Sequence, residues 1–198
     1  MKNKLKIIKI AIIFLVSTIT LNAQESVQGI FVTSNDFRMN KISYAPLMNK
    51  KYKISLHDVF YKSVINIQIG DSIFTIKKES IFGYSDIKNT VFRFKGNSLY
   101  KVINPTENIL LYSKTVLGGF KNLQTITKFY FSQNDSSAIL PLTKWNLKNA
   151  FMNDSAFHEL LDMEFSIDND LMQYDNFYKM YKLNRVFQFA HQLIQSAK

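Results

Sequence analysis

The sequence predicts an α+β fold in which an antiparallel sheet comes first and helices follow it. From residue 28 to about residue 140, apolar and polar residues alternate, which is the period of half-buried antiparallel strands. After Pro141 the apolar residues recur with the period of an amphipathic helix. Turn residues separate the strand-like segments at close spacing. This favours a β meander, sandwich or small barrel with the C-terminal helices packed on the sheet.

The clearest hairpin comprises residues 64–69 and 72–76. Its first strand places three isoleucines on one face and leaves Asn66 and Gln68 on the other. Gly70 begins a two-residue turn of the kind that requires a positive φ angle. This segment therefore predicts two antiparallel strands with one buried face.

The other strand-like segments follow the same reasoning. They are residues 29–33, 91–94, 99–103, 109–112, 126–132 and 138–140, with a short capped turn of helix expected at 34–39. Glycine, asparagine and proline lie between several of these segments, as is typical of turns. Within residues 80–86, Gly83 lies between two aromatic residues, which indicates a bulge or a close backbone approach.

Three helices are predicted in the C-terminal region. Thr143 and Asp154 are each placed to cap the N-terminus of a helix, and Asp175 is placed to begin the last one. Apolar residues share one face after each of these positions, and no proline or glycine interrupts the region. We therefore expect helices that pack their apolar faces on the sheet.

Residues 1–23 have the organisation of a secretory signal peptide. Four lysines and no acid precede a mostly apolar run at 10–21, and Ala23 is the small residue expected at the cleavage site. The run is shorter than the roughly 20 residues that span a bilayer, so we expect no transmembrane segment in the mature chain. An uncleaved anchor and a buried N-terminal helix are the alternatives. Cleavage would export the protein to the periplasm, the cell surface or the extracellular space.

The mature chain is expected to be one domain over residues 24–198, β-rich at 24–141 and helical at 142–198, because no Gly/Ser- or Pro-rich linker separates the two regions. The sequence contains no cysteine, which excludes disulfides, Cys-ligated zinc, iron–sulfur clusters, a thiol nucleophile and a lipoprotein anchor. A chain of this length can bury about 70% of its unfolded surface, so it needs no disulfide.

The formal net charge of +10 raises the question of nucleic-acid binding. Four positive charges lie in the predicted signal peptide, and the mature chain keeps a net charge of +6, divided into +7 for residues 24–141 and −1 for residues 142–198. Export argues against a nucleic-acid partner, and the aromatic residues among the lysines are those of a sheet core. We expect instead an envelope component or a partner protein, with the oligomeric state left open.

Candidate binding residues come from two regions of the sequence. They are Lys50, Lys51, Lys53 and Arg93 in the cationic region, and Asn184 and Arg185 at the end of an aromatic-rich segment. On one interpretation, Asn184 and Arg185 are polar contacts within an aromatic groove. On the alternative interpretation the segment docks on the sheet, and Asn184 satisfies a backbone group of a loop.

The sequence contains few candidate catalytic residues. His158 and Asp162 have the spacing of two ligands on one helix face, but no third ligand is identifiable. A Gly-x-Ser-x-Gly elbow and a phosphate-binding loop are both absent. We therefore expect no catalytic residue, no metal site and no cofactor. Two rival hypotheses are a small-ligand carrier with an aromatic-lined cavity and an exported hydrolase whose acidic residues converge on His158.

Several motifs are more specific than the periodicity. They include Ser-Ile-Phe-Gly-Tyr at 80–84, Phe-Arg-Phe at 92–94, 100–105 leading into 109–112, 129–132, 147–151, 157–162 and 178–185. With these motifs, most of the mature chain resembles a family of small exported Bacteroidetes proteins that has no assigned activity. The family often has a basic residue where this chain has Ser85. The resemblance implies export and the fold, and it supplies no catalytic residues.

Overall fold

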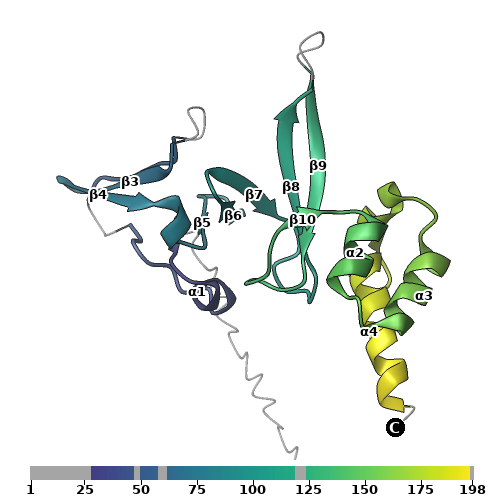
Figure 1. The fold of residues 1–198 in the computed structure, drawn as a ribbon. Helices are drawn as coiled ribbons and strands as arrows, with labels where there is room; N and C mark the ends of the chain where they lie inside the picture. Colours follow the sequence, from purple (N-terminus) through teal and green to yellow (C-terminus); the bar gives the residue numbers. More distant parts are fainter. Residues whose placement is uncertain (1–27, 47–49, 58–61, 119–123, 197–198) are drawn as a thin grey trace, which may run out of the picture.

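The computed structural model describes residues 28–46, 50–57, 62–118 and 124–196, and it confirms the α+β class. Its main element is an open antiparallel sheet of seven strands (Figure 1). In spatial order they are β1 (Gly29–Phe31), β5 (Gly83–Ser85), β6 (Val91–Lys95), β7 (Ser98–Val102), β8 (Leu110–Leu117), β9 (Thr125–Ser132) and β10 (Leu140–Pro141). Strands β5 to β10 form a meander, and the ends of the sheet do not meet. The predicted signal peptide, residues 1–23, lies outside the described residues.

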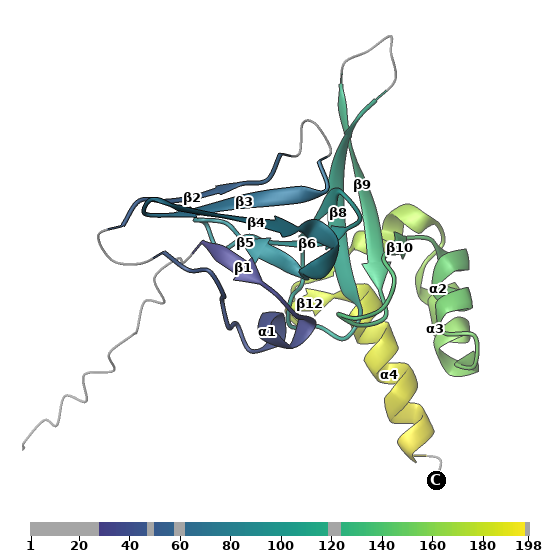
Figure 2. The same cartoon turned by 60° about the vertical axis from the view of Figure 1, so that its left-hand side comes forward.

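A second sheet of three antiparallel strands packs against the first strands of the meander (Figure 2). It consists of β2 (Tyr52–Ser55), β3 (Val64–Ile69) and β4 (Ser72–Lys77). Ile65 and Ile67 of β3 are fully buried and pack with Tyr84 and Phe94 of the large sheet. Gly70 has a φ of +62°, which confirms the predicted turn. This end of the molecule is therefore a small sandwich.

Strand alternation divides the rest of the core between the two faces of the large sheet. Tyr100 and Tyr112 lie on one face and pack with Phe37 of the short helix α1 (Ser34–Arg38). Leu111 and Phe131 lie on the other face and pack against the C-terminal helices. The helices therefore cover one face of the meander, as the sequence predicts.

The helical region contains α2 (Lys144–Ala150), α3 (Ser155–Glu164), a 3₁₀ turn η3 (Asp168–Met172) and α4 (Lys182–Ser196). The Thr143 hydroxyl accepts a hydrogen bond from the Asn146 N–H at 3.1 Å, and the Asp154 carboxylate accepts one from the Phe157 N–H at 3.0 Å. Both predicted N-caps are confirmed. Among the described residues, no helix has both the length and the apolar character to span a membrane.

The prediction that the last helix begins at Asp175 was wrong. The chain first forms a hairpin of β11 (Tyr174–Asp175) and β12 (Met180–Tyr181), and α4 starts after it. The Asp175 carboxylate accepts hydrogen bonds from the N–H groups of Phe177 and Tyr178 at 3.0 and 3.1 Å. An aspartate can close a turn in this way as readily as it caps a helix, and here it closes the hairpin.

Strands β8 and β9 extend beyond the rest of the large sheet as a two-stranded ribbon (Figures 1 and 2). They pair with each other over eight residue pairs. Strand β7 pairs with β8 at only two, Lys101↔Ser113 and Val102↔Tyr112, and β10 pairs with β9 only at Tyr130 and Phe131. The outer ribbon, which we define as residues 114–117 and 125–128, therefore has no ladder partner but itself among the described strands.

Candidate binding surface

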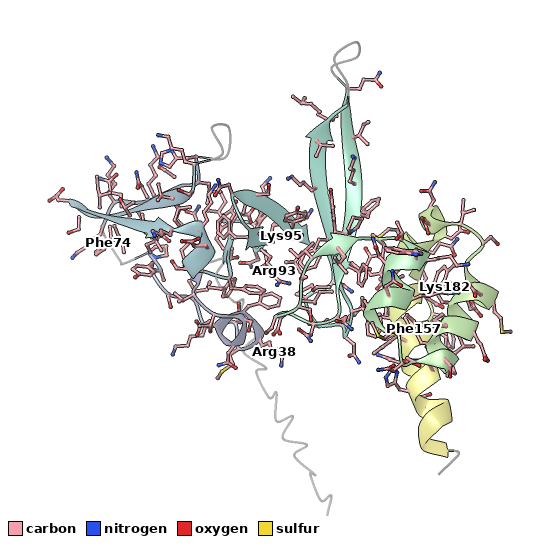
Figure 3. The ribbon with its side chains drawn as sticks, viewed as in Figure 1. Arg38, Phe74, Arg93, Lys95, Phe157 and Lys182 are labelled. Atoms are coloured by element: carbon pink, nitrogen blue, oxygen red, sulfur yellow. The ribbon has the colours of Figure 1, made fainter. Side chains whose placement is uncertain are left out.

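The six predicted binding residues lie in three separate parts of the fold. Lys50, Lys51 and Lys53 are exposed at β2, an edge strand of the small sheet. Figure 3 shows this sheet, marked by Phe74, at one end of the molecule, Arg93 in the middle and Lys182 in the helical region at the other end. The structure therefore does not bring the six residues into one site.

Arg93 holds a loop on the large sheet. Its guanidinium donates to the Tyr112 hydroxyl at 2.9 Å, to the Ser132 hydroxyl at 3.2 Å and to the Ser137 carbonyl at 2.7 Å. It also lies 5.2 Å from the centroid of the Phe82 ring, at cation–π distance. The N–H groups of Arg93 that form these bonds therefore have their hydrogen-bond partners within the protein.

Asn184 joins α4 to the loop before β8. Its side chain is fully buried, accepts a hydrogen bond from the Ile109 N–H at 2.8 Å and donates one to the Ile109 carbonyl at 2.9 Å. Arg185 lies beside Glu164 and Asp175, with N···O distances of 3.4 Å to each. Asn184 therefore satisfies a loop backbone, and Arg185 links α4 to α3 and to the β11–β12 hairpin.

His158 and Asp162 are engaged with different groups. The Nε2 atom of His158 lies within hydrogen-bond distance of the carbonyl oxygens of Lys148 and Phe151, at 3.1 and 3.0 Å. Lys148 and Lys144 hydrogen bond to the Asp162 carboxylate and lower its pKa. Within the described ranges, no three His, Asp or Glu side chains lie close enough to hold a metal ion.

A polar surface hollow of about 530 Å³ lies beside α1 and the loops before β8 and β10. Arg38 donates through Nη2 to the Asp135 carboxylate at 2.8 Å, and Nε also donates to it. Burial raises the pKa of Glu107, and hydrogen bonds to its carboxylate offset this in part. Phe37 is the aromatic residue among those that line the hollow, which thus differs from the aromatic-lined cavity of the carrier hypothesis.

The strands β6 to β9 carry lysine and arginine without any acidic residue. Between residues 87 and 134 the sequence has seven Lys or Arg and a single acid, Glu107. Alternation places Lys95, Lys114 and Lys128 on the face of the sheet that carries Tyr100, and Lys101 on the opposite face. We call this acid-free region of β6 to β9 the cationic strands.

Lys114 and Lys128 lie directly opposite each other in the outer ribbon. Lys114 donates to the Ser98 hydroxyl at 2.8 Å, and its Nζ lies 5.2 Å from the centroid of the Tyr100 ring. Lys128 is exposed and has no ionic partner in the described part of the chain. Like charges at opposed positions of an antiparallel pair destabilise it, and the described residues supply no carboxylate that compensates this pair.

Apolar side chains lie near this pair of lysines on both faces of the ribbon. Next to it toward the tip, Val116 pairs with Ile126, whose side chain is 50% exposed. On the other face Leu117 and Phe129 are 73% and 40% exposed. Exposed apolar residues rimmed by polar or charged ones are typical of a surface that binds a partner.

Comparisons with protein-family models, with curated proteins and with solved structures found no match to the chain. Sequence reasoning missed Lys101, Lys114 and Lys128, because it weighed charge over the whole β-rich region. The long interval without acids, interrupted only by Glu107, was the signal that could have found them.

Proposed function

We propose that the protein is an exported, non-enzymatic binding module that holds an acidic partner of the cell envelope on its cationic strands. The expected export rests on the signal-peptide pattern of residues 1–23. The expected partner chemistry rests on the excess of lysine and arginine between residues 87 and 134.

The opposed pair Lys114–Lys128 carries this proposal. Two lysines that face each other on a two-stranded ribbon repel, and the fold supplies no carboxylate between them in the described residues. An acidic partner would relieve the repulsion and cover Val116 and Ile126, which lie beside the pair on the same face. The partner would therefore gain both electrostatic and hydrophobic free energy at one surface.

Capture of the partner from an envelope extract tests the proposal. We expect the double variant Lys114→Gln/Lys128→Gln to hold the partner at least tenfold less tightly, which is about 1.4 kcal/mol. Its thermal stability should change little, because the substitution removes a repulsion but also the Lys114–Ser98 hydrogen bond and the contact of Lys114 with the Tyr100 ring. Loss of binding with retained stability separates a role in binding from a role in folding.

The triple variant Lys50→Gln/Lys51→Gln/Lys53→Gln is the matched control. It removes more charge, but from the edge strand of the small sheet. We expect it to retain the partner. Equal capture by the wild type and the Lys114/Lys128 variant, or a loss confined to the triple variant, would contradict the proposed surface.

A further inference from the structure

The edge of β8 that faces β7 has backbone groups that meet no other strand among the described residues. The Ile103 N–H donates to the Leu111 carbonyl at 2.9 Å, so the backbone groups of Leu111 point toward β7. In an antiparallel strand this direction alternates, and Ser113, Thr115 and Leu117 therefore point the same way. The β7–β8 ladder ends at Lys101↔Ser113. In the described residues, the N–H and C=O groups of Thr115 and Leu117 consequently meet no neighbouring strand.

A fork opens where β7 and β8 separate. A hollow of about 330 Å³ lies between them, lined by Phe92, Ser98, Leu99, Lys101, Lys114 and Thr115 among others. Leu99 lies two residues before Lys101, so its backbone groups also face this gap. The Lys114–Ser98 hydrogen bond crosses the hollow at 2.8 Å. We use the name β7–β8 fork for this hollow and the two strand edges beside it.

The lining of the β7–β8 fork has the chemistry of a strand-binding site. Unpaired edges of antiparallel strands are templates for a further strand, which gains affinity through main-chain hydrogen bonds. The half-buried side chains of Phe92 and Leu99 offer an apolar contact. Lys101 and Lys114 point to opposite faces and so offer cations on both sides of an added strand.

We propose that the β7–β8 fork accepts an extended acidic segment of a partner polypeptide, which adds as a strand along the free edge of β8. Because the cationic strands carry lysine and arginine and no acidic residue, they favour carboxylate side chains on the added strand. This proposal rests on the proposed function and specifies its partner as a polypeptide in extended conformation. Strand addition would use both features of the β7–β8 fork, its lysine side chains and the backbone groups of β8 that meet no other strand in the described residues.

A synthetic peptide of Glu, Val and Thr with the eight-residue length of β8 is the probe. We expect it to bind the mature protein, and we expect backbone N-methylation at alternate residues to weaken binding at least tenfold, because N-methyl groups cannot donate to a strand edge. Equal binding of the methylated peptide would overturn strand addition. It would leave the proposed function standing, since charge alone would then account for binding.

Thr115→Pro and Thr127→Pro are matched variants of the protein. The Thr115 N–H faces the β7–β8 fork, whereas the Thr127 N–H faces the opposite edge of the ribbon, as does the Phe129 carbonyl that accepts from the Leu142 N–H. Neither proline removes a β8–β9 hydrogen bond, and proline is tolerated at such edge positions. We expect Thr115→Pro to weaken peptide binding at least tenfold and Thr127→Pro to leave it unchanged.

The remaining outcomes separate the two proposals. Equal effects of the two prolines, or no binding of the peptide to the wild type, would overturn strand addition at the β7–β8 fork. Capture by the wild type that fails in Lys114→Gln/Lys128→Gln would still support the proposed function in either case. Binding of vesicles with anionic lipids but not of the peptide would assign the surface to a membrane and would also overturn the strand proposal.

Discussion

Replacing Phe157 with alanine should lower the free energy of unfolding by about 3–5 kcal/mol. The ring is fully buried and makes edge-to-face contacts with Phe151 and Phe187, at centroid distances of 5.2 and 5.3 Å. It lies in the cluster that joins α3 and α4 to Leu111 and Phe131 of the large sheet. The substitution therefore leaves a cavity at the joint between the helical and β-rich regions.

Denaturant titration with two probes measures this effect. Near-ultraviolet circular dichroism reports on the packing of the buried aromatic rings, and far-ultraviolet circular dichroism reports on the secondary structure of the whole fold. Trp145 is 72% exposed and is therefore not suitable as a probe. We expect the two transitions to coincide and to shift together in Phe157→Ala, because one core joins the regions. The control is Phe177→Ala, whose ring is 85% exposed and should matter little. A near-ultraviolet transition that moves alone would contradict a single cooperative domain.

Replacing Asn184 with leucine should cost about 2–3 kcal/mol of stability. The side chain is fully buried and forms two hydrogen bonds with the backbone of Ile109. The Ile109 carbonyl would keep its second donor, Asn104, at 2.8 Å. The Ile109 N–H would lose its partner and stay buried, which carries the full cost of desolvation.

Asn149→Leu is the control for this substitution. Asn149 is exposed on α2, so the same change in side chain should alter stability by no more than about 0.5 kcal/mol. The measurement is the midpoint and slope of guanidinium unfolding for both variants. Equal losses would show that the buried contact with Ile109 is not the source of the effect.

Local signals in the sequence predicted much of the fold. The alternation at 64–76 and the glycine turn at Gly70 predicted β3 and β4, because the period and the turn are both encoded within a few residues. The caps at Thr143 and Asp154 were predicted for the same reason, since a cap bonds backbone groups two or three residues away. The predicted signal peptide at 1–23 stays a prediction.

Features that depend on tertiary neighbours were missed or misread. Aspartate is common both at helix N-caps and in turns, so the residue type of Asp175 does not distinguish the two roles. Its contacts with Arg185 and with the turn show that it closes the hairpin. The prediction for β8 stopped at residue 112, whereas the strand reaches Leu117. The short strand β2 was also missed, because four residues carry too little periodicity to be recognised.

The candidate site was the least predictable part. Lys114 and Lys128 are fourteen positions apart in the sequence, and the register of β8 and β9 makes them neighbours. The β7–β8 fork arises from the separation of two strands, which no local pattern encodes. Arg93 was predicted from the charge of its region, and the structure places it in internal hydrogen bonds. For Asn184 the observed bonds with Ile109 agree with the alternative interpretation, in which it satisfies the backbone of a loop. The one signal for this surface in the sequence was the interval between residues 87 and 134, in which Glu107 is the single acidic residue.

Site-directed photocrosslinking in cells tests the central claim most directly. A benzophenone amino acid at Ile126 lies on the ribbon face that carries Lys114 and Lys128, whereas one at Ile73 lies on the small sheet. Both side chains are at least half exposed, at 50% and 65%. We expect a discrete adduct from the Ile126 variant and none from the Ile73 variant. Adducts of equal or greater yield from Ile73 would contradict binding at the cationic strands.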